Sequence, residues 1–328
     1  MRGARTAAYG VRRVVLGAAC CGRRDVRRAA VVAVGVVAAC GVVAACGGVR
    51  GGANSLDGGQ LPATWYAGGV SCAGRPPFLV HAYNPDFYIL RQAACTNYEK
   101  PFLYLIFGRE RVLLLDTGAG GVDVVGPIDT LIRGWLARNG RGSIELVVAH
   151  SHGHGDHVAG DSQFISRRAT RVVGRDTASV RAFFRIAHWP SDSATFDLGD
   201  RVLDVLPIPG HQPASIAIHD RRTGVLLTGD TFYPGRLYVR DTADFARSIS
   251  RLADFARRHA VTLMLGAHIE QSTTPFVDYP RGTVDQPAEH TLELGRAALF
   301  ELDSTVLAMR GRFVRTALRD VTVWPPSP

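Results

Sequence analysis

The sequence lacks several features that mark large classes of protein. Its most apolar run, residues 29–45, is shorter than the ~20 residues of a membrane-spanning helix and contains no Leu, Ile or Phe. No internal repeat is present. Hydrophobic residues make up 46% and charged residues 20% of the 328-residue chain, which is typical of a folded globular protein.

A large excess of basic charge is also missing from most of the chain. The net charge is +9, but residues 1–46 carry eight arginines against one acid, Asp25. Without that segment, the 38 basic and 29 acidic residues fall to 30 and 28, a net charge near +2. This balance predicts no nucleic-acid partner.

The N-terminal segment predicts export. Four arginines between positions 23 and 28 precede the apolar run, the order found in secretion signals. Two stretches that end at Cys40 and Cys46 resemble the bacterial lipobox, in which the cysteine is lipidated. We therefore expect residues 1–46 to be an export or lipoprotein signal. The protein would then lie in the cell envelope or periplasm, held at the membrane surface by a lipid or an uncleaved leader.

Cysteine is scarce beyond this segment, where Cys72 and Cys95 remain. An oxidising compartment favours one disulfide between them, and two buried thiols are the alternative. Residues 47–62 are rich in glycine, which is typical of a flexible linker, so we expect residues 63–328 to form the folded domain.

Strand and helix patterns alternate along that domain. Short apolar segments predict strands, and residues with helical spacing predict helices. The expected strands are 102–108, 111–118, 144–150, 170–174, 201–211, 215–220, 224–230 and 261–268, and the expected helices are 127–138, 177–184, 241–259 and 287–309. The fold class is therefore α/β or α+β.

Imidazoles and carboxylates recur where the predicted strands end. They are Asp116, the cluster His150-Ser-His-Gly-His-Gly-Asp-His157, His211, Asp230 and His268. Strand ends are where such proteins place their sites, and this ligand chemistry suits zinc and other borderline divalent metals. His152 and His154 can project from the same side of an extended segment. The pattern predicts a three-histidine site beside an acid and histidine site, with a carboxylate such as Asp230 between them.

These motifs resemble the metallo-β-lactamase superfamily. The segment 151–157, Ser-His-Gly-His-Gly-Asp-His, matches the His-x-His-x-Asp-His signature. Asp116 before it, and His211, Asp230 and His268 after it, stand in the family's order. The resemblance covers about residues 100–270. It implies an α+β fold, a four-layer αβ/βα sandwich with the metals at one edge.

The resemblance also implies a role for each residue. His152, His154 and His211 would hold one zinc, and Asp156, His157 and His268 a second, although iron or manganese could replace zinc. Asp230 would bridge the two metals, and Asp116 would orient a ligand imidazole.

The implied activity is hydrolysis of a small-molecule substrate. Zinc lowers the pKa of bound water towards ~7, so a bridging hydroxide could attack an ester, lactone or similar acyl compound, with Asp156 handling the proton. Asp230 stands where true zinc β-lactamases carry Cys or Ser, which indicates a glyoxalase II or lactonase type of ligand set. A phosphodiesterase on the same metals is the alternative. A metal-binding envelope lipoprotein without turnover is the hypothesis from another class.

Other residues near these motifs have weaker assignments. Tyr238 could contact substrate or pack in the core. His150 lies outside the signature, so we expect a core or supporting role for it. Glu270 and His290 could line the mouth of the site. The sequence does not predict an oligomeric state.

Overall fold

The computed structural model describes residues 56–66 and 68–326. Six strands form the first sheet, in the spatial order β1 (Phe78–Asn84), β2 (Phe87–Gln92), β3 (Phe102–Phe107), β4 (Arg111–Leu115), β5 (Glu145–Ala149) and β6 (Thr170–Val172). Neighbours from β1 to β4 are antiparallel, whereas β5 and β6 run parallel to β4. The carboxyl ends of β4, β5 and β6 therefore meet at one edge of this sheet.

Six more strands form a second sheet. Their order is β13 (Glu293–Leu294), β12 (Leu263–Gly266), β10 (Val225–Gly229), β9 (Ile216–Asp220), β8 (Val202–Pro207) and β7 (Ala194–Asp197). Only the β10–β12 pair is parallel among these neighbours, so β10 and β12 end at the same edge. A small third sheet consists of β11 (Arg236–Tyr238), β15 (Thr322–Trp324) and β14 (Thr316–Ala317).

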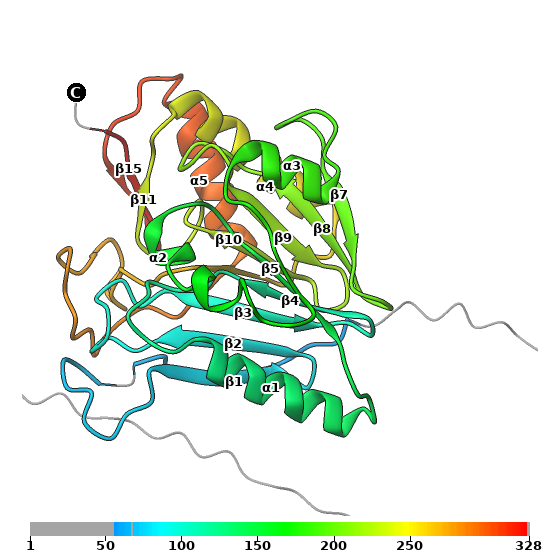
Figure 1. Cartoon of the computed structure of the whole chain (residues 1–328). Coiled ribbons are helices and arrows are strands. Elements are labelled where there is room, and N and C mark those ends of the chain that lie inside the picture. Colours follow the sequence, from blue (N-terminus) through cyan, green and yellow to red (C-terminus); the bar gives the residue numbers. More distant parts are fainter. Residues whose placement is uncertain (1–55, 67, 327–328) are drawn as a thin grey trace, which may run out of the picture. The chain divides into compact units, whose positions relative to one another are not determined.

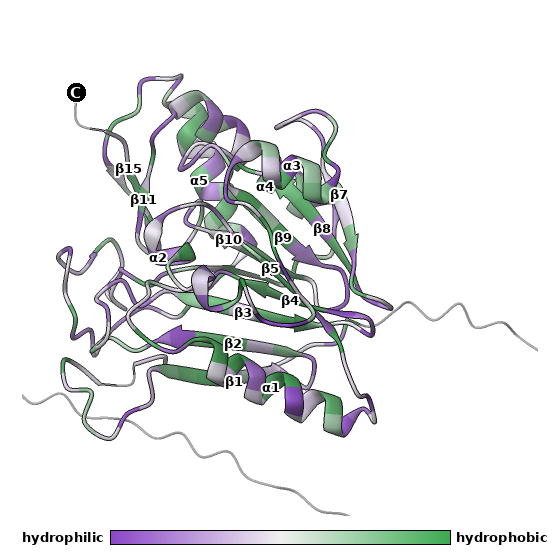
Figure 2. Ribbon diagram, in the orientation of Figure 1, coloured by the Kyte–Doolittle hydropathy of each residue, from purple (hydrophilic) through white to green (hydrophobic). Residues whose placement is uncertain are grey.

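Helices cover the outer faces of the two large sheets, which gives four layers (Figure 1). In β4, Leu113 and Leu115 pack in the core between the sheets, whereas Val112 and Leu114 pack with α1 (Val125–Arg138). The second sheet packs on α4 (Thr242–Arg258) and α5 (Arg296–Ala308). Figure 2 shows the strands coloured mainly as hydrophobic, as a sheet buried on both faces requires. The predicted α+β sandwich is confirmed.

Helix α4 shows how local sequence determines an element. The Asp241 carboxylate accepts a hydrogen bond from the backbone N–H of Asp244 at 2.8 Å, which caps the helix. Phe245, Ile249 and Leu252 then recur on one face and are fully buried. The predicted helix 241–259 is confirmed within one residue at each end.

The predicted helix 287–309 is wrong over its first part, because α5 begins only at Arg296. Residues 287–295 instead contain β13, which pairs with β12, and a bridge between Glu289 and Ser272. Strands β1, β2, β7, β11, β14 and β15 were not predicted. In β2 the apolar run is only Phe87–Leu90, and the strand continues through the buried polar residues Arg91 and Gln92.

The predicted signal, with Cys40 and Cys46, lies outside the described residues. Residues 56–62, which the sequence assigns to the linker, contact the folded body where they are described. The Asp57 N–H donates to the Arg222 carbonyl at 2.8 Å, and the Gln60 N–H to the Tyr83 carbonyl at 3.1 Å. Within residues 56–66 and 68–326, no helix has the length and apolarity that a membrane crossing needs.

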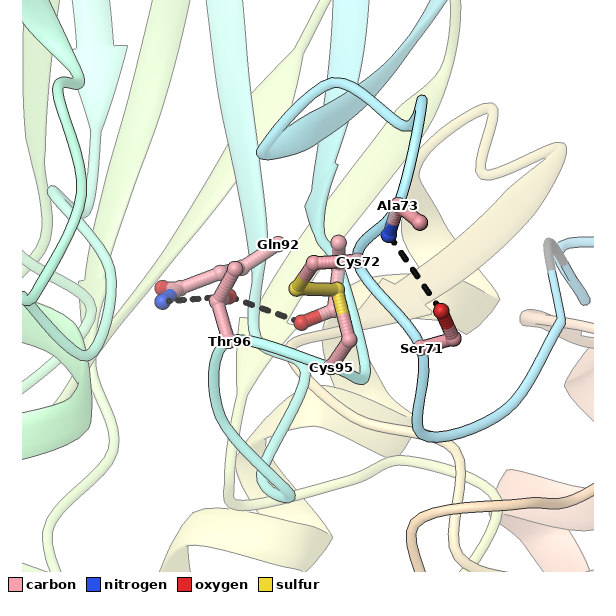
Figure 3. Close-up of a disulfide and its surroundings, with 7 residues drawn as sticks. Ser71, Cys72, Ala73, Gln92, Cys95 and Thr96 are labelled. Atoms are coloured by element: carbon pink, nitrogen blue, oxygen red, sulfur yellow. Dashed lines mark hydrogen bonds between the residues drawn. A yellow bond between two sulfur atoms is a disulfide. The ribbon is translucent and has the colours of Figure 1, made fainter.

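A disulfide joins Cys72, in the loop before β1, to Cys95, in the connection between β2 and β3 (Figure 3). Beside it, the Gln92 side chain donates from Nε2 to Thr96 Oγ1 at 3.2 Å. The Thr96 hydroxyl in turn donates to the Ala93 carbonyl at 2.8 Å. The disulfide therefore links the β2–β3 connection covalently to the loop before β1.

Candidate metal centre

Seven side chains from four stretches of the chain meet at the edge where strands of both sheets end. His152 and His154 follow β5, and Asp156 and His157 belong to the short helix α2 (Gly155–Val158). His211 lies between β8 and β9, Asp230 follows β10, and His268 follows β12. They form two groups, each able to hold a metal ion: His152, His154 and His211 in one, and Asp156, His157, Asp230 and His268 in the other.

In the three-histidine group, ring nitrogens face one another. His152 Nε2 lies 2.9 Å from His154 Nδ1, and His211 Nε2 lies 3.0 Å from the same atom. The rings are nearly perpendicular, with centroids 4.6–4.7 Å apart. Three nitrogen lone pairs therefore converge on one point.

The second group mixes imidazoles and carboxylates. His157 Nε2 and His268 Nε2 lie 3.3 Å from each other, and each lies 3.3 Å from Asp156 Oδ2. Both nitrogens also lie 3.4 Å from Asp230 Oδ1. Two imidazole nitrogens and two carboxylate oxygens thus surround one position.

Asp230 connects the groups. Its Oδ1 faces the second group, whereas its Oδ2 lies 3.6 Å from His211 Nε2 and 3.8 Å from His152 Nε2. Oδ1 is buried and has no hydrogen-bond partner within the described part of the chain. A buried carboxylate oxygen without a donor is costly, which is the condition that a bound cation relieves.

The spacing of the ligand atoms fits zinc. Zinc bonds of 2.0–2.2 Å to nitrogen and oxygen in a tetrahedron separate the ligand atoms by about 3.3–3.6 Å. The separations given above within each group are 2.9–3.4 Å, and all ligand atoms of a group lie within 4.8 Å of one another. The residues present therefore fit a metal ion in each group, and imidazole with carboxylate suits zinc as well as iron or manganese.

The outward nitrogens of three histidines are held by the protein. His157 Nδ1–H donates to Asp116 Oδ2 at 2.9 Å, His211 Nδ1–H to the Tyr238 carbonyl at 2.8 Å, and His268 Nδ1–H to the Glu99 carbonyl at 2.9 Å. Each bond directs the Nε2 lone pair inward and fixes the ring orientation.

Asp116 also holds Ser151, a residue that the sequence analysis missed. Asp116 Oδ1 accepts from the Ser151 backbone N–H at 2.7 Å, and Oδ2 accepts from the Ser151 hydroxyl at 2.8 Å. Ser151 Oγ lies 3.1 Å from His152 Nδ1. Asp116 adopts a positive φ of 69°, a conformation tolerated by Asp and common at functional sites. Its position directly before the signature was the available clue to Ser151.

Gly229 allows this packing. It has a positive φ of 52°, and a Cβ there would lie 2.7 Å from the Ser151 Cβ. The close approach of β10 to the signature loop thus requires glycine directly before Asp230.

Burial and charge set the protonation of the ligands. Burial lowers the pKa of His152 well below 6.5, which keeps its imidazole neutral. Burial would raise the pKa of Asp230, but the imidazoles of His268 and His157 outweigh it and hold that pKa below its usual range. Burial would lower the pKa of His268, but the Asp230 and Asp156 carboxylates raise it to about 9. The carboxylates therefore carry the charge that attracts a cation.

The remaining candidate residues lie outside both groups. His150 Nε2 lies 2.8 Å from Asp161 Oδ1, in a supporting position. Tyr238 meets the centre through its backbone, while its hydroxyl accepts from Arg236 Nε at 3.1 Å. Half-buried Glu270 accepts from the Arg236 backbone N–H, and His290 lies 3.4 Å from Asp320.

Comparison with known proteins matches the part of the chain that contains the candidate ligands. The sequence pattern of the metallo-beta-lactamase superfamily matches residues 101–268, half of the chain. The acyl-coenzyme A thioesterase MBLAC2 of Bos taurus is 27% identical over 202 residues, which are 51% of this chain and 72% of that protein. A hydroxyacylglutathione hydrolase of Anaeromyxobacter dehalogenans (strain 2CP-C) is 36% identical over 103 residues, which are 30% of this chain and 38% of that protein. A solved metallo-beta-lactamase from Pontibacter korlensis aligns with a TM-score of 0.45 and 16% identity, over 70% of this chain and 99% of that chain.

Proposed function

The chain belongs to the metallo-beta-lactamase superfamily and is a hydrolase, and we propose that it uses two zinc ions to hydrolyse a small acyl substrate. One observation carries this proposal: the two carboxylate oxygens of Asp230 face two separate ligand groups. A site for one metal needs no such bridge.

His152, His154 and His211 would hold one zinc, Asp156, His157 and His268 the other, and Asp230 both. Bound zinc would supply an acidified water nucleophile and positive charge for the oxygen that becomes negative during attack. The chain's own residues position these ligands. Asp116 and the carbonyls of Glu99 and Tyr238 hold the rings in place.

Asp156 is the ligand suited to pass a proton. Its side chain is 24% exposed, against 9% for Asp230, so it can exchange protons with solvent. We assign it the transfer of a proton to or from water during turnover.

The substrate class is supported by the relatives. One is named an acyl-coenzyme A thioesterase and another a hydroxyacylglutathione hydrolase, and both names describe acyl compounds. We therefore propose an ester, thioester or lactone as the substrate of this chain, with a phosphodiester as the alternative.

Metal analysis and a substrate panel test this function. We expect about two zinc ions per chain and metal-dependent hydrolysis of a thioester, ester or lactone, with a rate at least ~100-fold lower in Asp156→Ala. Asp254→Ala, a change at an exposed helix position, serves as the control. One iron per chain would contradict the zinc pair, and faster cleavage of bis-nitrophenyl phosphate would establish the phosphodiesterase. No metal-dependent turnover at all would favour a metal-binding protein.

We also propose that the chain is exported and lipid-anchored, on the basis of the basic and apolar segment before residue 47. Labelled fatty acid should be incorporated in cells, and globomycin should block processing. Cys46→Ala or Cys40→Ala should abolish the label, which identifies the modified cysteine. Label that persists in both single variants and in the double variant would contradict the anchor.

A further inference from the structure

A small cavity lies apart from the two ligand groups, between the loop before β1, the β2–β3 connection and residues 284–289. Its volume is about 100 Å³, and none of the seven candidate metal ligands lines it. Much of its wall is apolar and comes from Trp65, Pro76, Leu79, Ala93 and Val284. Tyr66 and Arg75 line it where it reaches the surface.

The only lysine of the sequence, Lys100, lines this cavity. The chain has 38 basic residues, so the other 37 are arginines. Lys100 is 4% exposed and adopts a positive φ of 49°. Its ammonium donates to the carbonyls of Thr283 at 3.1 Å and Val284 at 3.5 Å, but has no carboxylate within 4 Å in the described ranges.

Burial, followed by the Arg91 guanidinium, lowers the pKa of Lys100 to about 8. The amine is therefore mostly charged at pH 7. The charge of Arg91 is balanced, because Nη1 and Nη2 donate to the Glu289 carboxylate at 2.5 and 2.8 Å. The cavity thus keeps one positive charge that no carboxylate neutralises directly.

Three buried polar atoms of the lining have no hydrogen-bond partner within the described residues. They are Trp65 Nε1, Arg91 Nε and Gln286 Oε1, on residues that are 2%, 4% and 5% exposed. Two are donors and one is an acceptor. Buried polar atoms are nearly always satisfied, so a molecule that fills this cavity must offer acceptors and one donor.

We propose that this cavity binds a short-chain hydroxycarboxylate of about four carbons. Its carboxylate accepts from Lys100, Trp65 Nε1 and Arg91 Nε, and its hydroxyl donates to Gln286 Oε1. The carbon chain packs on Leu79 and Val284. At about 100 Å³ the cavity is smaller than the ~150 Å³ cavity that encloses benzene, so the polar groups of the ligand enter it and the end of the carbon chain extends to the opening at Tyr66 and Arg75. The inference goes beyond the proposed function and does not depend on it.

Calorimetric titration of the purified protein with 3-hydroxybutyrate, butyrate and butyramide tests the proposal. We expect 3-hydroxybutyrate to bind most tightly and butyramide, which lacks the charge, at least about tenfold more weakly. Lys100→Met and Trp65→Phe should each weaken binding of 3-hydroxybutyrate about tenfold. Trp135→Phe removes an indole N–H that donates to Asp86 outside the cavity, and it should bind like the parent protein.

A second readout uses the single lysine. 3-Hydroxybutyrate should slow acetylation of Lys100 by acetic anhydride, followed by mass spectrometry, and should leave the N-terminal amine unprotected. Because carboxylates also bind zinc, the titration is repeated with Asp230→Asn, in which the metal groups are impaired. Binding that persists there places the ligand outside the metal centre, whatever becomes of the proposed hydrolysis.

Several results would overturn the proposal. Equal binding of butyramide removes the role of charge, and unchanged binding in folded Lys100→Met and Trp65→Phe removes the role of the cavity. Loss of binding in Asp230→Asn assigns the carboxylate to the metal. Absence of binding and of lysine protection with all three probes leaves water as the occupant.

Discussion

Asp116 holds two residues of the candidate centre, Ser151 and His157, in place. One oxygen holds the Ser151 backbone, and the other accepts from both the Ser151 hydroxyl and His157 Nδ1. All of these bonds are buried, so water cannot replace them. The negative charge of Asp116 also makes His157 a stronger ligand.

Asp116→Asn should therefore weaken metal binding. The amide removes the charge and can present an N–H to His157, so we expect 10–100-fold lower zinc affinity. Zinc retained after dialysis against a graded chelator series measures the effect. Asp254→Asn changes the same chemical group on the surface and should retain zinc like the parent. Equal zinc affinity in both variants would contradict the role of Asp116.

Two polar networks stabilise β8 and β9, the strands on either side of His211. Arg201, which is fully buried, donates to both oxygens of Asp220 at 3.0 and 2.6 Å. It also donates to the carbonyls of Asp86 and Phe107 at 2.9 Å each. Phe107 ends β3 and Asp220 ends β9, and these strands belong to different sheets and run opposite to β4 and β10. The guanidinium therefore joins the two sheets at the edge opposite the candidate centre.

Arg201→Met should destabilise the fold by about 3–5 kcal/mol, because it leaves a buried carboxylate without its partner. Urea unfolding measures the change in the free energy of unfolding. Arg109→Met, at an exposed pair with Asp200, should cost less than ~1 kcal/mol. The double variant Arg201→Met/Asp220→Asn should recover part of the lost free energy of unfolding. A cost below ~1 kcal/mol for Arg201→Met would show that Arg201 does not stabilise the contact between the sheets.

The second network joins β8 to β9 and predicts a pH effect. Burial would raise the pKa of Asp204, but hydrogen bonds from His219 and Arg221 lower it to about 2 from 3.8. Because the folded pKa lies below the unfolded one, this stabilisation is complete above pH ~5 and is lost as the pH falls towards 2. Its size is about 1–2 kcal/mol after allowance for solvent screening at the exposed Arg221.

Asp204→Asn removes the group that titrates. The difference in unfolding free energy between parent and variant should shrink by that amount as the pH falls from 5 to 2. Urea unfolding at a series of pH values provides the comparison. A difference that is independent of pH would show that Asp204 does not have a lowered pKa.

For the whole molecule, the disulfide between Cys72 and Cys95 restrains the unfolded chain. The cysteines are 23 residues apart, and closing a loop of that length stabilises a fold by about 3 kcal/mol. Dithiothreitol should lower the free energy of unfolding by that amount in the parent and have no effect on Cys72→Ser/Cys95→Ser. A fully reduced parent of unchanged stability would contradict this expectation.

Much of the element pattern could be predicted from local sequence. The helix at 177–184 and the apolar strands 102–108 and 111–118 follow spacing and capping rules that act over a few residues, and the structure has them at nearly those positions. The errors fall where distant contacts decide. Residues 287–295 extend because β12 offers a pairing edge, and β2 is a strand although it carries Arg91, whose charge is balanced by distant Glu289.

The sequence alone determined which side chains stand at the strand ends, and with them the superfamily and the ligand chemistry. A motif such as His152-Gly-His154-Gly-Asp156-His157 is local, so its spacing survives any change elsewhere in the chain. The tertiary structure decided how they combine: that Asp230 faces two groups, that Asp116 holds both Ser151 and His157, and that Lys100 lines a separate cavity. These contacts join residues far apart in the chain, and only the packing of the two sheets brings them within bonding distance.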